Sequence, residues 1–396
     1  MKLKKMFLYI CFFSNLMPLF SQQIVNLEKA IEIAKKQNLG LQTTALEIEM
    51  TRKMQKSAFD LPKTDFSMQY GNVNDFQVDY SFNVVQNFSL PHVYQKKLKY
   101  NQQQTILTEK KRSFQEKEMV KMIKITYYQI IFLYEKQALL LQQDSLQKLL
   151  LRTAEVRVRT GEGKELEKLS ANLLLQDLKN QLLQVDNELK VQKEELKKLL
   201  NITDNIEIED KKLIKRFMNM TQIDVSKNPY LLFSKQQIEL QKSNTEVQKS
   251  AFSPDLKLGY YNMRENENPN LHVAQLGVAL PIFNTGRKAM VASAKINEKI
   301  AESQFAYQTQ TTERNFEILK AQLERSQEAI NYYENNAIPQ IDKIQKVFQK
   351  SYQSGEISYV ELTQNRLQTF QILMNYLQEL SNYNQIIISI EFLIGE

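Results

Sequence analysis

The longest uninterrupted helical pattern in the chain restricts its possible folds more than any other feature. From Val93 to Arg159 the sequence contains neither proline nor glycine, and apolar side chains recur at steps of three and four residues. At ~1.5 Å per residue, this stretch predicts roughly 100 Å of helix. A compact domain of this size has no room for such a rod. We therefore expect the helix to be part of a coiled coil or one stave of a larger tube.

Three further stretches have a similar composition, rich in Leu, Gln, Lys, Glu and Ala, which favours helix. They are Lys164–Leu200, Arg287–Ala337 and Val360–Ile394. The chain has only nine glycines and eight prolines in 396 residues, which argues against an all-β protein or a loop-rich multidomain enzyme. The sequence therefore predicts a mainly α fold.

The chain also contains an internal repeat. The pentapeptide Gln55–Phe59 recurs unchanged as Gln248–Phe252, and other landmarks recur in the same order at a spacing of about 190 positions. These pairs are Asn38 and Asn228, Pro62 and Pro254, Pro91 and Pro281, and Gly161 and Gly355. We interpret the chain as a tandem duplication, with a first repeat over 22–201, a linker over 202–222 and a second repeat over 223–396.

Each repeat carries a predicted strand pair between its prolines. In the first repeat, Phe76–Val84 alternates apolar and polar residues, and Asp65–Tyr70 is its expected partner. In the second, Leu256–Tyr260 and Leu271–Leu280 flank a polar loop over 264–269. Two hairpins cannot close a barrel alone. Either they lie in water, or several chains pool their strands; three chains with four strands each would give a closed barrel of twelve.

The first 21 residues have the pattern of a secretory signal peptide, with a basic start and an apolar run over Met6–Phe20. Cys11, the only cysteine, lies inside this run without the preceding small residue of a lipoprotein signal, so we expect it to be removed rather than lipidated. The exported chain would then have neither a disulfide framework nor a thiolate metal site. Because no later run of about 18 apolar residues occurs, any membrane-spanning part is expected to consist of strands.

The net charge argues against nucleic-acid binding, and the positions of the histidines argue against catalysis. The formal net charge of +7 includes three leader lysines, and the remainder is too dilute for a nucleic-acid footprint. The two histidines, His92 and His272, lie neither beside a nucleophile nor in metal-ligand spacing. There is no phosphate-binding loop, so any transport must be driven by a partner. We expect no enzyme activity, no cofactor and no nucleic-acid binding.

Together these landmarks resemble the TolC-like outer membrane efflux proteins over nearly the whole chain after the leader. The most specific match is Leu280–Arg287, which is similar to the strand-to-helix exit of that family; the equivalent Leu90–Gln95 lacks its Gly-Arg pair. The resemblance implies a homotrimer in the outer membrane, in which a tandem-duplicated α-barrel of long helices continues into a twelve-stranded β-barrel. The strand–helix joints would be Pro62, Pro91, Pro254 and Pro281.

The resemblance also implies a functional site at the periplasmic tips, where the long helices reverse at Gly161 and Gly355. In the family an acidic residue six positions after this glycine faces the narrowed pore mouth, and Glu167 and Glu361 occupy that place. We expect them to form the pore gate, with an ordinary solvated helix glutamate as the alternative for each.

Two further features of the tips bear on this site. Some members of the family carry an additional aspartate nine positions after the glycine, where this chain has Ser170 and Gln364, so the sequence leaves the strength of the acidic gate open. Exposed residues beside the glycines are the expected contacts of a periplasmic adaptor. The candidates are Arg159, Gly161, Leu169, Ser170, Tyr352, Gly355, Leu362 and Thr363.

The resulting functional hypothesis is a passive exit duct of a tripartite efflux or secretion system. An inner-membrane pump and its periplasmic adaptor would deliver substrates to it, and its barrel would lie in outer-membrane lipid. The alternative from another class is a periplasmic coiled-coil adaptor or scaffold, which would not need two hairpins with lipid-like alternation. A secreted hydrolase is excluded because the catalytic groups are missing.

Overall fold

The computed structural model of the chain describes residues 23–72, 76, 78–219, 223–265 and 268–396. The predicted signal peptide, residues 1–21, lies outside this part of the chain, as do residues 73–75 and 77 near the start of the predicted strand Phe76–Val84. The division into repeats and linker at 202–222 stays a prediction, although the order of elements in the two halves can be compared directly.

The first half contains a short strand, two short helices, a hairpin and two long helices. These elements are β1 (Gln23–Val25), α1 (Leu27–Gln37), α2 (Leu39–Met54), the 3-10 helix η1 (Gln55–Phe59), β2 (Asp65–Gly71), β3 (Asp79–Ser89), α3 (Pro91–Arg159) and α4 (Glu165–Leu200).

The second half has a closely similar order. Its elements are β4 (Ile206–Ile208), the 3-10 helix η2 (Val225–Lys227), α5 (Pro229–Ser250), β5 (Asp255–Glu265), β6 (Asn268–Ala279), α6 (Thr285–Tyr332), the π-helical segment η3 (Tyr333–Ala337), α7 (Ile338–Gln353) and α8 (Tyr359–Leu393). The π-helical segment interrupts the helix just before Pro339, whose missing N–H prevents a regular continuation.

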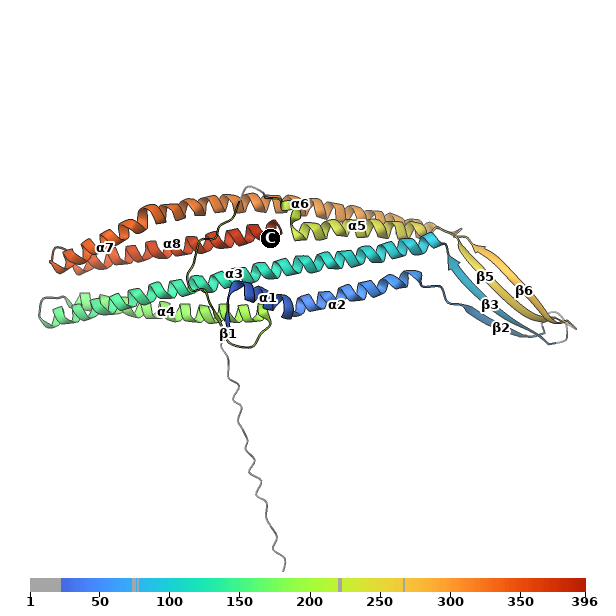
Figure 1. Cartoon of the computed structure of the whole chain (residues 1–396), viewed down its shortest axis with the longest axis horizontal. Helices are drawn as coiled ribbons and strands as arrows, with labels where there is room; N and C mark the ends of the chain where they lie inside the picture. The colour runs from blue at the N-terminus through green and yellow to red at the C-terminus, as the bar shows by residue number, and fades with distance from the viewer. Residues whose placement is uncertain (1–22, 73–75, 77, 220–222, 266–267) are drawn as a thin grey trace, which may run out of the picture.

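The long helices make the molecule a rod with the sheet at one end and two helical turns at the other (Figure 1). The predicted helix of about 100 Å is confirmed, because α3 runs for 69 residues and begins with proline in its first turn. Helix α3 lies against α4, α5 and α8, and α6 lies against α5 and α8. The described helices include none that is long and apolar enough to cross a membrane.

The two hairpins form one antiparallel sheet in the order β2-β3-β5-β6. Its register places apolar residues opposite one another on one face: Met68 faces Phe82, and Leu258 faces Leu276. The neighbouring positions point to the other face, where Gln69 is opposite Ser81. The sheet therefore has one largely apolar face and one mainly polar face, as the alternation predicts for β2 and β3.

The predicted strand bounds are wrong in three places. Strand β3 begins at Asp79 rather than Phe76 and continues to Ser89, because β5 supplies backbone partners beyond the point where the alternation breaks at Val84-Val85. The expected polar loop over 264–269 is shorter, since β5 reaches Glu265 and β6 starts at Asn268. Proline is tolerated near the start of β6 because this strand lies at the edge of the sheet.

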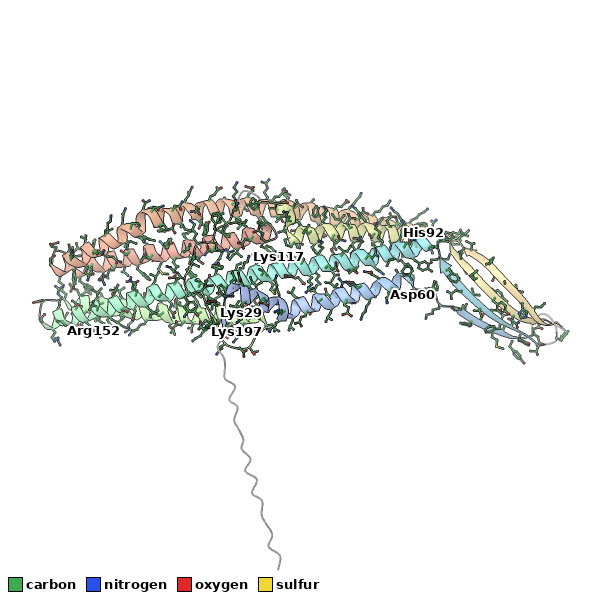
Figure 2. The ribbon with its side chains drawn as sticks, viewed as in Figure 1. Lys29, Asp60, His92, Lys117, Arg152 and Lys197 are labelled. Carbon is green, nitrogen blue, oxygen red and sulfur yellow. The ribbon has the colours of Figure 1, made fainter. Side chains whose placement is uncertain are left out.

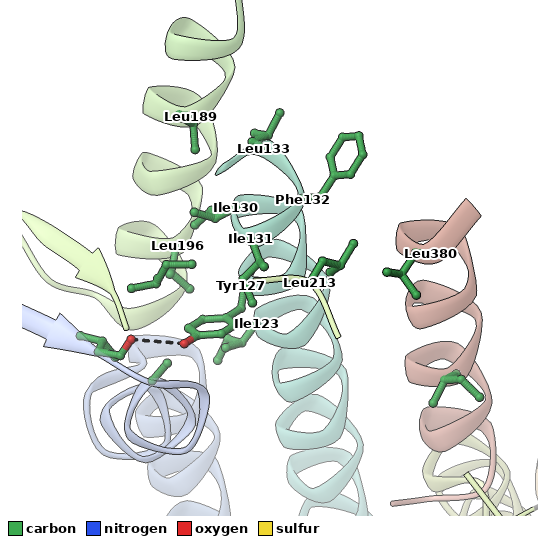
Figure 3. Packing of buried hydrophobic residues seen from close by; sticks show 14 of the residues in the cluster. Ile123, Tyr127, Ile130, Ile131, Phe132, Leu133, Leu189, Leu196, Leu213 and Leu380 are labelled. Carbon is green, nitrogen blue, oxygen red and sulfur yellow. Dashed lines mark hydrogen bonds between the residues drawn. The ribbon is translucent and has the colours of Figure 1, made fainter. Parts of the chain in front are cut away.

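The main core lies near the middle of the rod, where the helices, the linker and the short β1–β4 pair meet (Figure 3). Tyr127 and Ile130 of α3 are almost fully buried there against Leu196 of α4, and Leu213 of the linker packs nearby. The Tyr127 hydroxyl donates to Asp210 Oδ2 at 2.8 Å. The stretch of α3 from Met119 to Tyr134 therefore has contacts on several sides, which explains why it is apolar nearly all round.

Candidate functional site at the helical tips

Two tight turns reverse the long helices at the end of the rod opposite the sheet. Gly161 joins α3 to α4, and Gly355 joins α7 to α8; both have φ of +78°. At the first turn the N–H of Glu162 donates to the Arg157 carbonyl, and at the second the N–H of Glu356 donates to the Ser351 carbonyl, both at 2.9 Å. A residue with a Cβ would be strained at either glycine. The sequence prediction of glycine turns is confirmed.

The two predicted gate carboxylates lie in the first turn of the returning helices, but their surroundings differ. Glu361 is exposed and belongs to a capping box: its Oε2 accepts from the Ser358 N–H at 2.7 Å, and its own N–H donates to Ser358 Oγ at 3.3 Å. These bonds from Ser358, the backbone N–H first, lower the pKa of Glu361. Glu361 therefore has a structural role at the helix start in addition to any role at a pore mouth.

Glu167 has no equivalent cap, because Lys164 stands where the second turn has Ser358. Its side chain is half-buried and contributes to the electrostatic environment of Arg157. The assignment of both glutamates to a gate stays a prediction. Sequence reasoning missed the capping box, although the Ser-x-x-Glu pattern at 358–361 is its usual signature.

A polar contact joins the two tips. The Arg157 guanidinium of α3 donates to the Tyr352 hydroxyl of α7 at 3.2 Å and lies over the Tyr352 ring, 6.0 Å from its centroid. The hydrogen bond to Tyr352 raises the pKa of Arg157, and the charges of Glu167 and Glu162 act in the same direction. This contact, which was not predicted, links the first helical hairpin to the second.

The predicted docking residues divide into exposed and packed positions. Arg159, Leu169 and Ser170 are exposed, as expected. The expectation for Leu362 is wrong: it is only 3% exposed, because it packs with Leu150 and other residues in a small core between the hairpins. Tyr352 and Thr363 are half-buried.

A small cavity of about 60 Å³ lies behind the tip between α3, α4 and α8. Thr363 and Arg366 of α8 are among its lining residues, with Gln147 and Asp177 opposite. Burial lowers the pKa of Arg366, and neither its Nη1 atom nor Thr363 Oγ1 has a hydrogen-bond partner among the described residues. Among those residues, no group of His, Cys, Asp and Glu could hold a metal ion.

The four predicted joint prolines lie at the other end of the helices. Pro62 precedes β2, Pro254 precedes β5, Pro281 follows β6 and Pro91 is the first residue of α3. Hydrogen bonds between side chains connect the two halves of the chain here: His92 Nε2 is 2.7 Å from Ser253 Oγ, and Ser89 Oγ donates to Asp255 Oδ1 at 2.8 Å. Figure 2 labels His92 at this boundary between helices and sheet.

Comparisons with known proteins agree with this architecture. Residues 225–396 match the sequence model of a family described as outer membrane efflux protein. No curated protein matches the sequence.

Several solved structures share the fold over nearly the whole chain. CusC matches with a TM-score of 0.78 at 15% identity, covering 94% of this chain and 93% of its own. VceC, an outer membrane protein of Vibrio cholerae, matches with a TM-score of 0.77 at 14% identity, covering 93% and 96%. The open state of the Neisseria gonorrhoeae MtrE outer membrane channel matches with a TM-score of 0.77 at 15% identity, covering 93% and 89%.

Proposed function

We propose that this chain is one subunit of a trimeric passive exit duct. Its fold is that of TolC-like outer membrane channels, and its residues 225–396 match the family of outer membrane efflux proteins. We place this subunit in the outer membrane, extending into the periplasm, as a channel rather than an enzyme; the match of residues 225–396 to the outer membrane efflux protein family supports this placement. In the proposal, an inner-membrane pump and its periplasmic adaptor deliver substrates to the duct. The observation that carries it is the four-stranded sheet with two free edges and one exposed apolar face.

The sheet supports pooling of strands between copies. Among the described residues, β2 and β6 each pair on one side only. Met68 of β2 and Leu276 of β6, both on the apolar face, are 69% and 84% exposed. In lipid, unpaired edges would leave backbone groups unsatisfied at several kcal/mol each, and closure with neighbouring copies removes them. Three copies would supply twelve strands, with the apolar faces toward lipid. An adaptor or scaffold has no comparable need for this sheet.

The helical part also has two free edges. The long helices lie side by side, with α4 at one edge of this layer, α7 at the other, and α3 and α8 between them (Figure 1). Exposed apolar residues recur along α4, and α7 exposes Ile344 and Val347. The α4 residues are Leu166, Leu173, Leu183 and Val191. Because the two edges differ, contact of α4 with α7 of the next copy would be a head-to-tail interface, and a rotation of one third of a turn between copies would close it into a ring of three.

The side chains at the helical tips support the part of the proposal in which partners open the pore mouth. The Arg157–Tyr352 contact holds two hairpins together, and Glu167 and Glu361 would add negative charge around the opening. A carboxylate ring favours cations at a constriction. The adaptor would dock around Gly161 and Gly355, using exposed groups such as Arg159, Leu169 and Ser170.

The assembly state tests this proposal. The full chain should be extracted from membranes with detergent, and native mass spectrometry should then give a complex of three chains. A stable monomer that is soluble without detergent would contradict the proposed duct, because a single copy leaves both sheet edges and the apolar face uncovered.

A further inference from the structure

The connection from β6 to α6 exposes an unusual number of large apolar side chains. Leu280 is 64% exposed, Ile282 is 75% exposed and Phe283 is 95% exposed, although all three lie beyond the last residue of the strand. The connection has a defined backbone, with the N–H of Ile282 donating to the Leu280 carbonyl at 3.0 Å. Exposure on this scale is unfavourable in water and indicates a surface that something apolar covers.

These residues continue the apolar face of the sheet. Leu276 and Val278 of β6 lie on that face and are 84% and 60% exposed. Leu280 follows directly on the last residue of β6, and the turn at Pro281 brings Ile282 and Phe283 after it. Exposed apolar side chains therefore continue without a gap from the end of the sheet to Phe283.

Positive charge follows directly after the apolar residues. Arg287 and Lys288 lie in the first turn of α6, and both are exposed. Within the described part of the chain neither forms an ion pair. Apolar side chains followed by unpaired cations are suited to a membrane interface, where the former enter the acyl region and the latter meet phosphate groups.

We propose that Leu280, Ile282, Phe283, Arg287 and Lys288, here called the exit collar, form a membrane-interface anchor that inserts into the periplasm-facing phospholipid leaflet. This inference rests on the proposed function, because it requires the sheet to lie in the bilayer. The collar fixes the depth of the sheet and the level at which α6 leaves the membrane. It binds a phospholipid surface, with anionic headgroups at the two cations.

The absence of tryptophan from the sequence allows a direct test. Phe283→Trp would be the only indole in the full chain, and the exposure of Phe283 makes the substitution structurally mild. The protein is reconstituted in vesicles of phosphatidylethanolamine and phosphatidylglycerol, brominated either near the glycerol or near the chain ends. The exit collar predicts blue-shifted emission that loses more intensity in lipid brominated near the glycerol.

Two further single-tryptophan variants separate the possible outcomes. Leu276→Trp reports whether the sheet is in the bilayer. Phe217→Trp is the control outside the bilayer: Phe217 lies in the segment after α4 and is 90% exposed, so its tryptophan should remain unquenched. Quenching of Leu276→Trp without quenching of Phe283→Trp would overturn the exit collar and leave the proposed function intact. If emission from Phe283→Trp is blue-shifted yet unquenched, a neighbouring copy covers this surface and the inference is wrong. Absence of quenching in both variants would contradict the proposed function itself.

Discussion

The Arg157 guanidinium and the Tyr352 hydroxyl are 3.2 Å apart and join helical hairpins whose contacting residues lie 195 positions apart in the sequence. This contact lies beside the two tip turns, and Arg157 also experiences the charges of Glu167 and Glu162. A single contact of this kind between exposed or half-exposed groups is weak enough to be broken by a docking partner. It is therefore suited to hold a mouth that must open.

Removing the Tyr352 hydroxyl should loosen the tip. Tyr352→Phe keeps the ring but removes the acceptor of the Arg157 hydrogen bond, so we expect a larger single-channel conductance in a planar bilayer. Tyr307→Phe, at a 66% exposed position on α6, is the matched control and should behave as wild type. Equal conductance in all three proteins would mean that the contact does not restrict the opening.

The charge and the cap at the second tip can be separated. Glu167→Gln combined with Glu361→Gln should reduce the cation preference, measured as the reversal potential in a salt gradient. Ser358→Ala keeps both carboxylates but removes the N-cap, which costs about 0.5–2 kcal/mol of local stability. It should leave the reversal potential unchanged. If the double variant retains full cation preference, the two residues are helix-start glutamates without a gate role.

Breaking a partly buried charge cluster should destabilise the middle of the rod. Glu391 Oε2 accepts from Lys124 at 2.7 Å and Glu391 Oε1 from Arg216 at 2.6 Å, so the carboxylate joins α3, the linker and α8. Glu391→Ala leaves two largely buried cations unpaired and should cost about 3–5 kcal/mol. Thermal unfolding in detergent measures this loss.

The control for this cluster is an ion pair on the surface. Glu195 pairs with Lys198 in α4 at 3.2 Å, and both side chains are exposed. Glu195→Ala should therefore change the free energy of unfolding by less than about 1 kcal/mol. Similar losses for Glu195→Ala and Glu391→Ala would show that the buried cluster contributes no more to the free energy of unfolding than a surface ion pair.

One helix–helix contact near the joints should depend on pH. Hydrogen bonds from Lys249 and then Lys96 lower the pKa of Glu246 to about 2, from the ordinary 4.5. Since the folded-state pKa is the lower one, the stabilisation is complete above the ordinary value and is lost as the pH falls toward about 2. The Glu246 side chain is 43% exposed, so the contribution should be only about 0.2–1 kcal/mol.

This contribution appears as a difference in unfolding temperature between wild type and Glu246→Gln. The difference should be constant from neutral pH down to about pH 5 and shrink below it. A difference that grows on acidification would have the wrong sign for a depressed carboxyl pKa.

The two faces of the sheet should respond differently to lysine. Met68 lies on the apolar face of β2, whereas the adjacent Gln69 is opposite Ser81 on the polar face. A lysine that faces lipid near the midplane costs about 2–4 kcal/mol, so Met68→Lys should lower the yield of membrane-assembled protein. Gln69→Lys should assemble normally. Equal yields would mean that the faces are misassigned or that the sheet lies in water.

The sequence predicts the elements that depend on local patterns and misses those that depend on distant contacts. The glycine turns and α3 follow directly from residue type and period, because φ above zero and a missing helix breaker are local properties. The end of β3 at Ser89 depends on pairing with β5, which the alternation does not encode.

The candidate site divides in the same way. The positions of Glu167 and Glu361 after the tip glycines follow from the sequence, and the Ser358–Glu361 cap could have been predicted from its pattern. The burial of Leu362 depends on how the second hairpin packs against the first. The Arg157–Tyr352 contact has the same origin, since nothing in either segment identifies its partner.

Electrical recording on the purified full chain tests the central claim most directly. If three copies form a duct, addition of the detergent-extracted protein to a planar bilayer should produce discrete, long-lived current steps, small in wild type and larger in Tyr352→Phe. A bilayer that stays electrically silent with both proteins, although both are present in the membrane, would contradict the account.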